Sequence, residues 1–152
     1  DYILLGVYSD DLIPVMAKVL CGLGIRHAMV VHGEDGFDEI SISAPTKVAE
    51  IKDGGIFEYT ITPEQFGLPL AEKEEVVGGS PEENALITQG ILAGTIRDAK
   101  RNIVLLNAGC ALYVVGQAGS IGDGVALAAE MIDSGAALAK LEELKQFTNA
   151  LA

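Results

Sequence analysis

The first 32 residues contain two short apolar segments joined by a helical segment, and this pattern restricts the fold most. Residues 2–8 and 27–32 are rich in residues that favour strands. Residues 11–23 predict a helix, because acidic residues precede the segment, Pro14 falls in its first turn and Gly24 follows it. A strand, a helix and a second strand in this order form a unit with parallel strands. The sequence therefore predicts an α/β fold.

An acidic turn follows the second apolar segment, from Gly33 to Glu39. Ligands of open α/β sheets bind beyond the carboxyl ends of parallel strands, where this turn would lie. Hard oxygen ligands such as carboxylates suit Mg²⁺. Spacing alone leaves two interpretations open, a solvated turn or a cation site, and the position after a parallel strand favours the cation site. The carboxylates are Glu34, Asp35, Asp38 and Glu39, and His32 at the strand end is the more plausible functional histidine, while His27 is structural.

A small antiparallel subsheet is expected after the acidic turn. Residues 38–43, 46–52 and 56–62 alternate between polar and apolar, and Asp53-Gly54-Gly55 is typical of a hairpin turn. Thr62-Pro63-Glu64-Gln65 is a capping box that opens one helical turn. Residues 67–79 combine glycines, a proline and a charge run, and they predict an exposed loop.

The remainder of the chain is predicted to be helical. The expected helices cover residues 81–93, 98–115, 121–133 and 135–150, the first opened by a capping box at Ser80. The helix over 98–115 is apolar around most of its circumference, which predicts burial on all sides. Asn107 within it is expected to be satisfied by neighbouring backbone groups. The predicted architecture is one α/β domain over residues 1–152, with parallel strands, a small antiparallel subsheet and a helical C-terminal layer.

Composition excludes several classes of function. The chain has 152 residues and a formal net charge of −12, so a free basic face for nucleic acid is not expected. It contains no apolar run of the roughly 20 residues needed to cross a bilayer. Cys21 and Cys110 lack metal-type spacing, which predicts reduced thiols in a cytoplasmic protein. No nucleophile with a partner base is recognisable, so no catalytic side chain is assigned.

The segment from His32 to Glu39 resembles the "VHG-x-DG-x-DE" segment of the anthranilate phosphoribosyltransferase family. Further similarities follow in the expected order over essentially the whole chain: Thr46, Val48–Ile51, Pro63-Glu64 to Gly67-Leu68, Gly78-Gly79 to Asn84-Ala85, and Asn107-Ala108.

The resemblance implies a nucleoside-phosphorylase-like fold and transfer of 5-phosphoribose from phosphoribosyl pyrophosphate to anthranilate in tryptophan biosynthesis. It implies Mg²⁺ as the cofactor, with Asp38 and Glu39 as metal ligands and Glu34 and Asp35 as turn residues. The family's glycine-rich phosphate loop, its "KHGNR" segment and its helical domain, which carries the homodimer interface, are not in this sequence. We therefore expect residues 1–152 to be the C-terminal part of the large α/β domain and to be inactive alone.

Two alternatives remain open at this stage. The chain is a fragment of a pyrimidine nucleoside phosphorylase, which shares the architecture, or it is a non-catalytic interaction module whose acidic turn is merely solvated.

Overall fold

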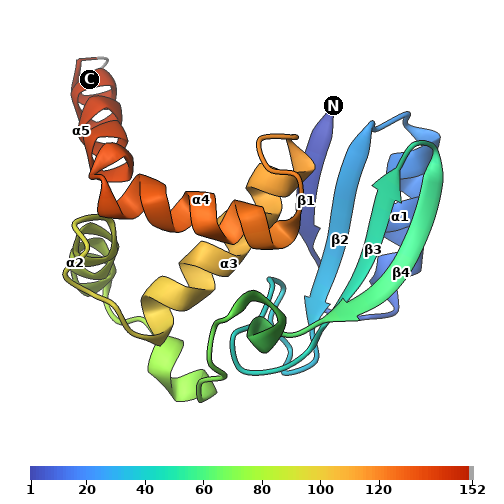
Figure 1. The fold of residues 1–152 in the computed structure, drawn as a ribbon, viewed down its shortest axis with the longest axis horizontal. Helices are drawn as coiled ribbons and strands as arrows, with labels where there is room; N and C mark the ends of the chain where they lie inside the picture. Colours follow the sequence, from blue (N-terminus) through green and yellow to red (C-terminus); the bar gives the residue numbers. More distant parts are fainter. Residues whose placement is uncertain (151–152) are drawn as a thin grey trace.

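A four-stranded mixed sheet forms one side of the molecule in the computed structural model, which describes residues 1–150 (Figure 1). The strands are β1 (Tyr2–Gly6), β2 (His27–Gly33), β3 (Thr46–Lys52) and β4 (Gly55–Ile61), side by side in that order. β1 and β2 are parallel, whereas β3 and β4 add antiparallel neighbours. The predicted parallel pair and the hairpin are therefore confirmed.

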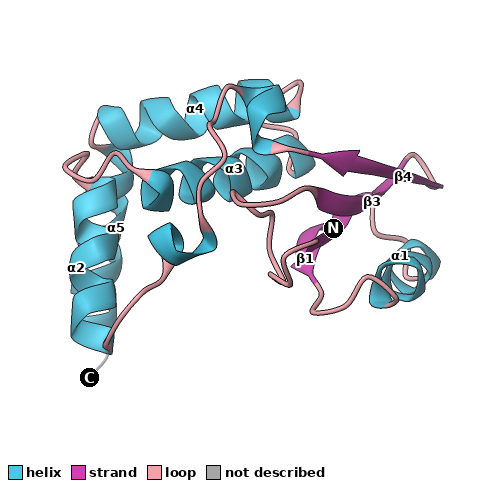
Figure 2. Ribbon diagram, turned by 90° about the horizontal axis from the view of Figure 1, so that it is seen from below, coloured by secondary structure: helices cyan, strands magenta, loops and turns pink. Residues whose placement is uncertain are grey.

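The two faces of the sheet bury different cores. Helix α1 (Leu12–Gly22) covers one face, and the other helices lie on the opposite side (Figure 2). Alternate side chains of β2 point to opposite faces, as the period of a strand requires. Ala28 and Val30 belong to the core under α1, and Met29 and Val31 belong to the larger core under the helical layer. Because both faces are covered, β2 is apolar along almost its whole length.

The helical layer contains α2 (Pro81–Leu92), α3 (Ala99–Val114), α4 (Ile121–Asp133) and α5 (Ala136–Asn149). Ser80 caps α2 in a capping box with Glu83, as predicted. α3 and α4 cross at Gly109 and Gly124, where each backbone occupies the space that a Cβ on the other would need. α3 also contacts β1 and β2, so it connects the helical layer to the sheet.

Two short 3₁₀ helices lie between β4 and α2. η1 (Pro63–Phe66) begins at the predicted capping box of Thr62 and Gln65. η2 (Lys73–Val76) lies within the segment predicted as a loop. Its charged residues are exposed, in agreement with the expectation for that segment.

The predicted strand over residues 38–43 is wrong. The structure has bends there, and the buried Ile40 and Ile42 are inserted into the core without a pairing strand. Side chains take the place of strand partners: the Ile40 amide donates to Asn107 and the Ser41 amide donates to Thr46 Oγ1. The alternating pattern of this segment therefore indicates which side chains are buried, and it does not indicate a paired strand.

The prediction that the helix over 98–115 is buried on all sides is also wrong. Val104 and Val115 of this segment are 36% and 42% exposed. They lie on an apolar groove of about 420 Å³ between α3 and α4, to which α2 and α5 contribute at the ends. Among the described residues, α3 is contacted by β1, β2, α4 and η2, and part of its apolar circumference stays exposed at Val104 and Val115.

Within the part of the chain that the structure describes, no helix combines the length and apolarity that crossing a membrane requires.

Candidate functional site

The acidic turn lies at the carboxyl ends of the parallel strands β1 and β2. Its backbone is closed by hydrogen bonds from the Gly36 amide to Gly33 O (2.8 Å) and from the Gly33 amide to Phe37 O (2.9 Å). Gly36 has φ +92°, a conformation that favours glycine. The carbonyl oxygen of Asp38 lies directly against Gly6, the last residue of β1. The turn therefore lies where ligands of α/β sheets bind.

Asp35 organises the turn from inside. Its carboxylate accepts hydrogen bonds from the hydroxyls of Ser41 (2.7 Å) and Ser43, and from the Phe37 amide (3.4 Å). Partial burial alone would raise the pKa of Asp35, but the bonds from Ser43 and Ser41 outweigh it and hold this pKa below its usual value. Asp35 is therefore a structural turn residue, as the resemblance implied.

Asp38 and Glu39 differ from Asp35 because both side chains are exposed. Neither carboxylate forms an ion pair with any residue between 1 and 150. Over the same residues no cluster of three or more potential metal-ligating side chains is present. Mg²⁺ is usually held by one or two carboxylates together with waters and substrate phosphates, so an exposed pair of carboxylates suits it.

Asn107 of α3 supports the turn on its far side. Its side-chain amide accepts a hydrogen bond from the Ile40 amide (3.0 Å) and donates to Ile40 O (2.8 Å). It also donates to Ile103 O within its own helix (3.0 Å). The expectation that backbone groups satisfy Asn107 is confirmed, and the partner is the residue directly after Glu39.

Lys73 supports the turn from η2. Its ammonium donates to the carbonyl oxygen of Asp35 (2.7 Å) and lies 4.5 Å from the centre of the Phe37 ring. Lys73 thus joins the residues on both sides of Gly36. The sequence interpretation missed this contact, because Lys73 belongs to a charge run that otherwise faces solvent.

His32 lies near the end of β2, and an ion pair joins Lys47 of β3 to Asp10 in the turn before α1. The Nδ1 atom of His32 is 2.8 Å from Val7 O, so Nδ1 carries the hydrogen of this bond and Nε2 is left for other contacts. Lys47, opposite His32 in the sheet, pairs with Asp10 at 2.7 Å. This hydrogen bond and the charge of Lys47 lower the pKa of Asp10.

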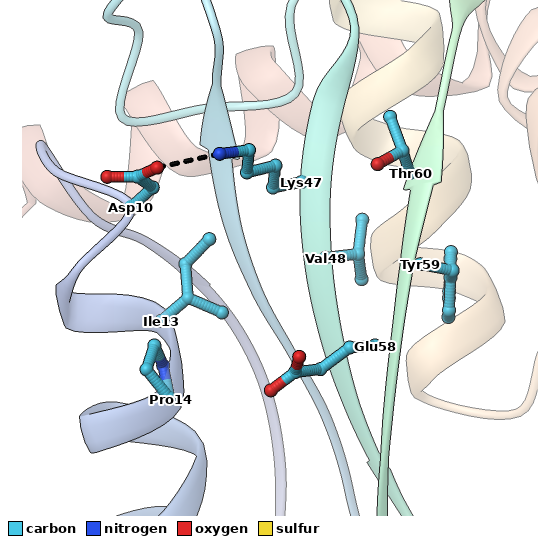
Figure 3. A pocket seen from close by; sticks show the side chains of 8 residues that line it. All are labelled: Asp10, Ile13, Pro14, Lys47, Val48, Glu58, Tyr59 and Thr60. Carbon is cyan, nitrogen blue, oxygen red and sulfur yellow. Dashed lines mark hydrogen bonds and ion pairs between the residues drawn. The ribbon is translucent and has the colours of Figure 1, made fainter.

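Asp10 and Lys47 line an open pocket of about 370 Å³ between α1 and strands β3 and β4, into which Glu58 extends (Figure 3).

A second polar cluster lies at the opposite end of β2, around the buried Glu50. Its carboxylate accepts hydrogen bonds from His27 Nε2 (2.8 Å), Tyr113 (2.8 Å) and Tyr59 (2.9 Å). Burial favours a raised pKa for Glu50, but the three hydrogen bonds prevail and hold it below its usual value. The cluster joins three strands to α3, and it confirms a structural role for His27.

Comparisons with known proteins agree with this arrangement. A family model described as "Glycosyl transferase family, a/b domain" matches residues 1–138. Anthranilate phosphoribosyltransferase of Methanobrevibacter smithii is 49% identical over 146 residues, which is 96% of this chain and 43% of that protein. The Haloarcula marismortui enzyme of the same name is 52% identical over 95% of this chain and 43% of its own length.

Solved structures give the same result. Anthranilate phosphoribosyltransferase from Thermus thermophilus superposes with a TM-score of 0.86 at 39% identity, covering 94% of this chain and 42% of that one. The Saccharomyces cerevisiae enzyme in complex with phosphoribosyl pyrophosphate and Mg gives a TM-score of 0.83 at 29% identity, over 91% and 40% of the two chains.

The chain thus spans less than half the length of these relatives, while almost all of it is matched by them. Its mixed sheet and helical layer reproduce the α/β fold of the phosphoribosyltransferase structures. From the match over residues 1–138, together with these likenesses, the chain belongs to the glycosyl transferase family, a/b domain.

Proposed function

We propose that this chain is the C-terminal part of the α/β domain of an anthranilate phosphoribosyltransferase. The observation that carries the proposal is the placement of Asp38 and Glu39. Their side chains are exposed at the carboxyl ends of β1 and β2, while the adjoining backbone is held by Gly6 and by Asn107. Two exposed carboxylates on a fixed turn can contribute ligands to a hydrated cation that also binds a phosphate group.

The proposed reaction transfers 5-phosphoribose from phosphoribosyl pyrophosphate to anthranilate. The anthranilate amine forms a bond to C1 of the ribose and loses a proton, while the C1–O bond breaks and pyrophosphate leaves with its electron pair. Mg²⁺ held by Asp38 and Glu39 would supply positive charge next to the departing oxygens. This chain contributes the two carboxylates and the backbone that fixes their position. The reaction requires no nucleophilic side chain.

The chain's charge sets a condition on this function. At a net charge of −12, residues 1–152 do not attract a pyrophosphate by themselves. The resemblance implies that other parts of a longer protein supply the phosphate loop, the remaining cations and much of the anthranilate site. We expect such a protein to be a homodimer in the cytoplasm, where the free thiols of Cys21 and Cys110 stay reduced.

The proposal is tested by an activity assay on the longer protein that contains this sequence. Phosphoribosyl pyrophosphate should be consumed together with anthranilate in a reaction that depends on Mg²⁺, and the 152-residue chain alone should show no turnover. Phosphorolysis of thymidine without any consumption of anthranilate would instead identify a pyrimidine nucleoside phosphorylase. If neither anthranilate nor thymidine is consumed, the result would favour a non-catalytic module.

A further inference from the structure

The turn that carries Asp38 and Glu39 is fixed at two points that lie far apart in the sequence. On one side the Asp38 carbonyl rests on Gly6 at the end of β1. On the other side the Asn107 side chain binds both backbone polar groups of Ile40, whose side chain is fully buried. The two carboxylates therefore lie on a short stretch of backbone between a contact to the sheet and a contact to α3.

The Asn107 side chain binds both backbone polar groups of Ile40, the residue that directly follows the acidic turn. No neighbouring strand provides partners for Ile40, because residues 38–43 are not part of the sheet. Without Asn107, the amide and carbonyl of Ile40 would lose these bonds at a partly buried position, which costs free energy unless the backbone moves toward water. Such a movement would begin next to Glu39.

We infer that Asn107 is a positioning residue for the metal ligands, acting through Ile40 on the orientation of Asp38 and Glu39. Outer residues that orient ligands typically change metal affinity by about 10- to 100-fold when they are removed. This inference rests on the proposed function, since it assumes that the two carboxylates bind a cation.

The same chain offers a matched control for a purely structural role. Asn84 of α2 accepts a hydrogen bond from the Gly79 amide (2.8 Å) and donates to Gly79 O (3.2 Å), so it makes the same type of clamp at a different site. The Asn84 clamp is exposed and the Asn107 clamp is partly buried, and only the clamp of Asn107 adjoins Asp38 and Glu39.

The test compares Asn107→Leu, which has a similar shape without the amide, with Asn84→Leu. Asn107→Ser is a second variant that avoids placing an apolar side chain at the site if the first does not fold. Two quantities are measured on the 152-residue chain below the unfolding transition of each variant. The first is backbone ¹⁵N relaxation of Asp38 and Glu39. The second is the Mn²⁺ concentration that gives half-maximal paramagnetic broadening of the turn amides, with Asp38→Asn and Glu39→Gln as references.

The inference predicts that Asn107→Leu lowers the order parameters of Asp38 and Glu39 from about 0.85 to below about 0.6. It also predicts that the Mn²⁺ midpoint rises about tenfold or more, while Asn84→Leu changes neither quantity. An unchanged Mn²⁺ midpoint in Asn107→Leu, with binding still lost in Asp38→Asn, would overturn the role of Asn107 alone. Equal Mn²⁺ broadening in wild type, Asp38→Asn and Glu39→Gln would show that the two carboxylates do not hold the cation in this chain, and it would overturn the inference.

Discussion

The carbonyl oxygen of Asp38 rests on Gly6 so closely that position 6 has no room for a side chain. This contact joins the acidic turn to the end of β1, although the two residues are separated by a helix and a strand. Gly6 is therefore required at this position for close backbone approach.

The first prediction concerns Gly6→Ala. The added Cβ collides with backbone, which cannot rotate away as a side chain would, so the variant should lose about 1–3 kcal/mol of unfolding free energy. Urea denaturation measures this loss. Gly22→Ala is the control, because nothing lies within 4 Å of a Cβ at that position at the end of α1. Equal stability of the two variants would contradict the close contact at Gly6.

The second prediction concerns Glu50. Glu50→Gln replaces a carboxylate that accepts three hydrogen bonds with an amide that cannot accept all of them. The variant should be less stable at pH 7 by roughly 1.5–3 kcal/mol, the range for hydrogen bonds to charged groups.

The pH dependence of this difference has a defined sign. The pKa of Glu50 is lower in the folded protein than its usual value of 4.5, so ionised Glu50 favours the folded state. Its contribution is complete above about pH 4.5 and disappears as the pH falls through the lowered folded pKa. Unfolding curves of wild type and Glu50→Gln should therefore converge as the pH falls below 4.5. A constant difference across this range would contradict the assignment.

The third prediction concerns Lys73. Lys73→Met removes the ammonium that binds the Asp35 carbonyl and lies over the Phe37 ring. An exposed cation–π contact stabilises by about 0.5–1 kcal/mol, so the variant should lose an amount of this order. Thermal unfolding of Lys18→Met, whose parent residue is exposed on α1, serves as the reference for a simple loss of charge. Equal unfolding temperatures of the two variants would show that Lys73 does not hold the turn.

The parts of the fold that local sequence determines were predictable. The capping boxes at Thr62 and Ser80 contain both partners within four residues, and they mark the starts of η1 and α2. The parallel arrangement of β1 and β2 follows from the helix between them. In each case the residues that decide the structure lie close together in the chain.

The features that escaped prediction depend on contacts between distant residues. The Asn107 amide replaces a strand partner for Ile40 across 67 positions, and the alternating pattern of residues 38–43 carries no sign of this. Lys73 reaches Asp35 across 38 positions from a charge run that is otherwise solvated. Similarly, the apolar circumference of α3 does not show which of its sides the described residues cover. The identity of Asp38 and Glu39 as metal ligands came from the resemblance and stays a prediction.

The most direct test of the central claim is the Mg²⁺ dependence of phosphoribosyl transfer in the longer protein that contains this sequence. Asp38→Asn and Glu39→Gln should each raise the Mg²⁺ concentration for half-maximal rate by about tenfold or more. Each should also cause a large loss of rate, because a bound metal ion stabilises the charge that develops in the transition state by several kcal/mol. Glu34→Gln changes an exposed carboxylate of the same turn and should leave the Mg²⁺ dependence unchanged. Wild-type rates and an unaltered Mg²⁺ dependence in both Asp38→Asn and Glu39→Gln would contradict the account.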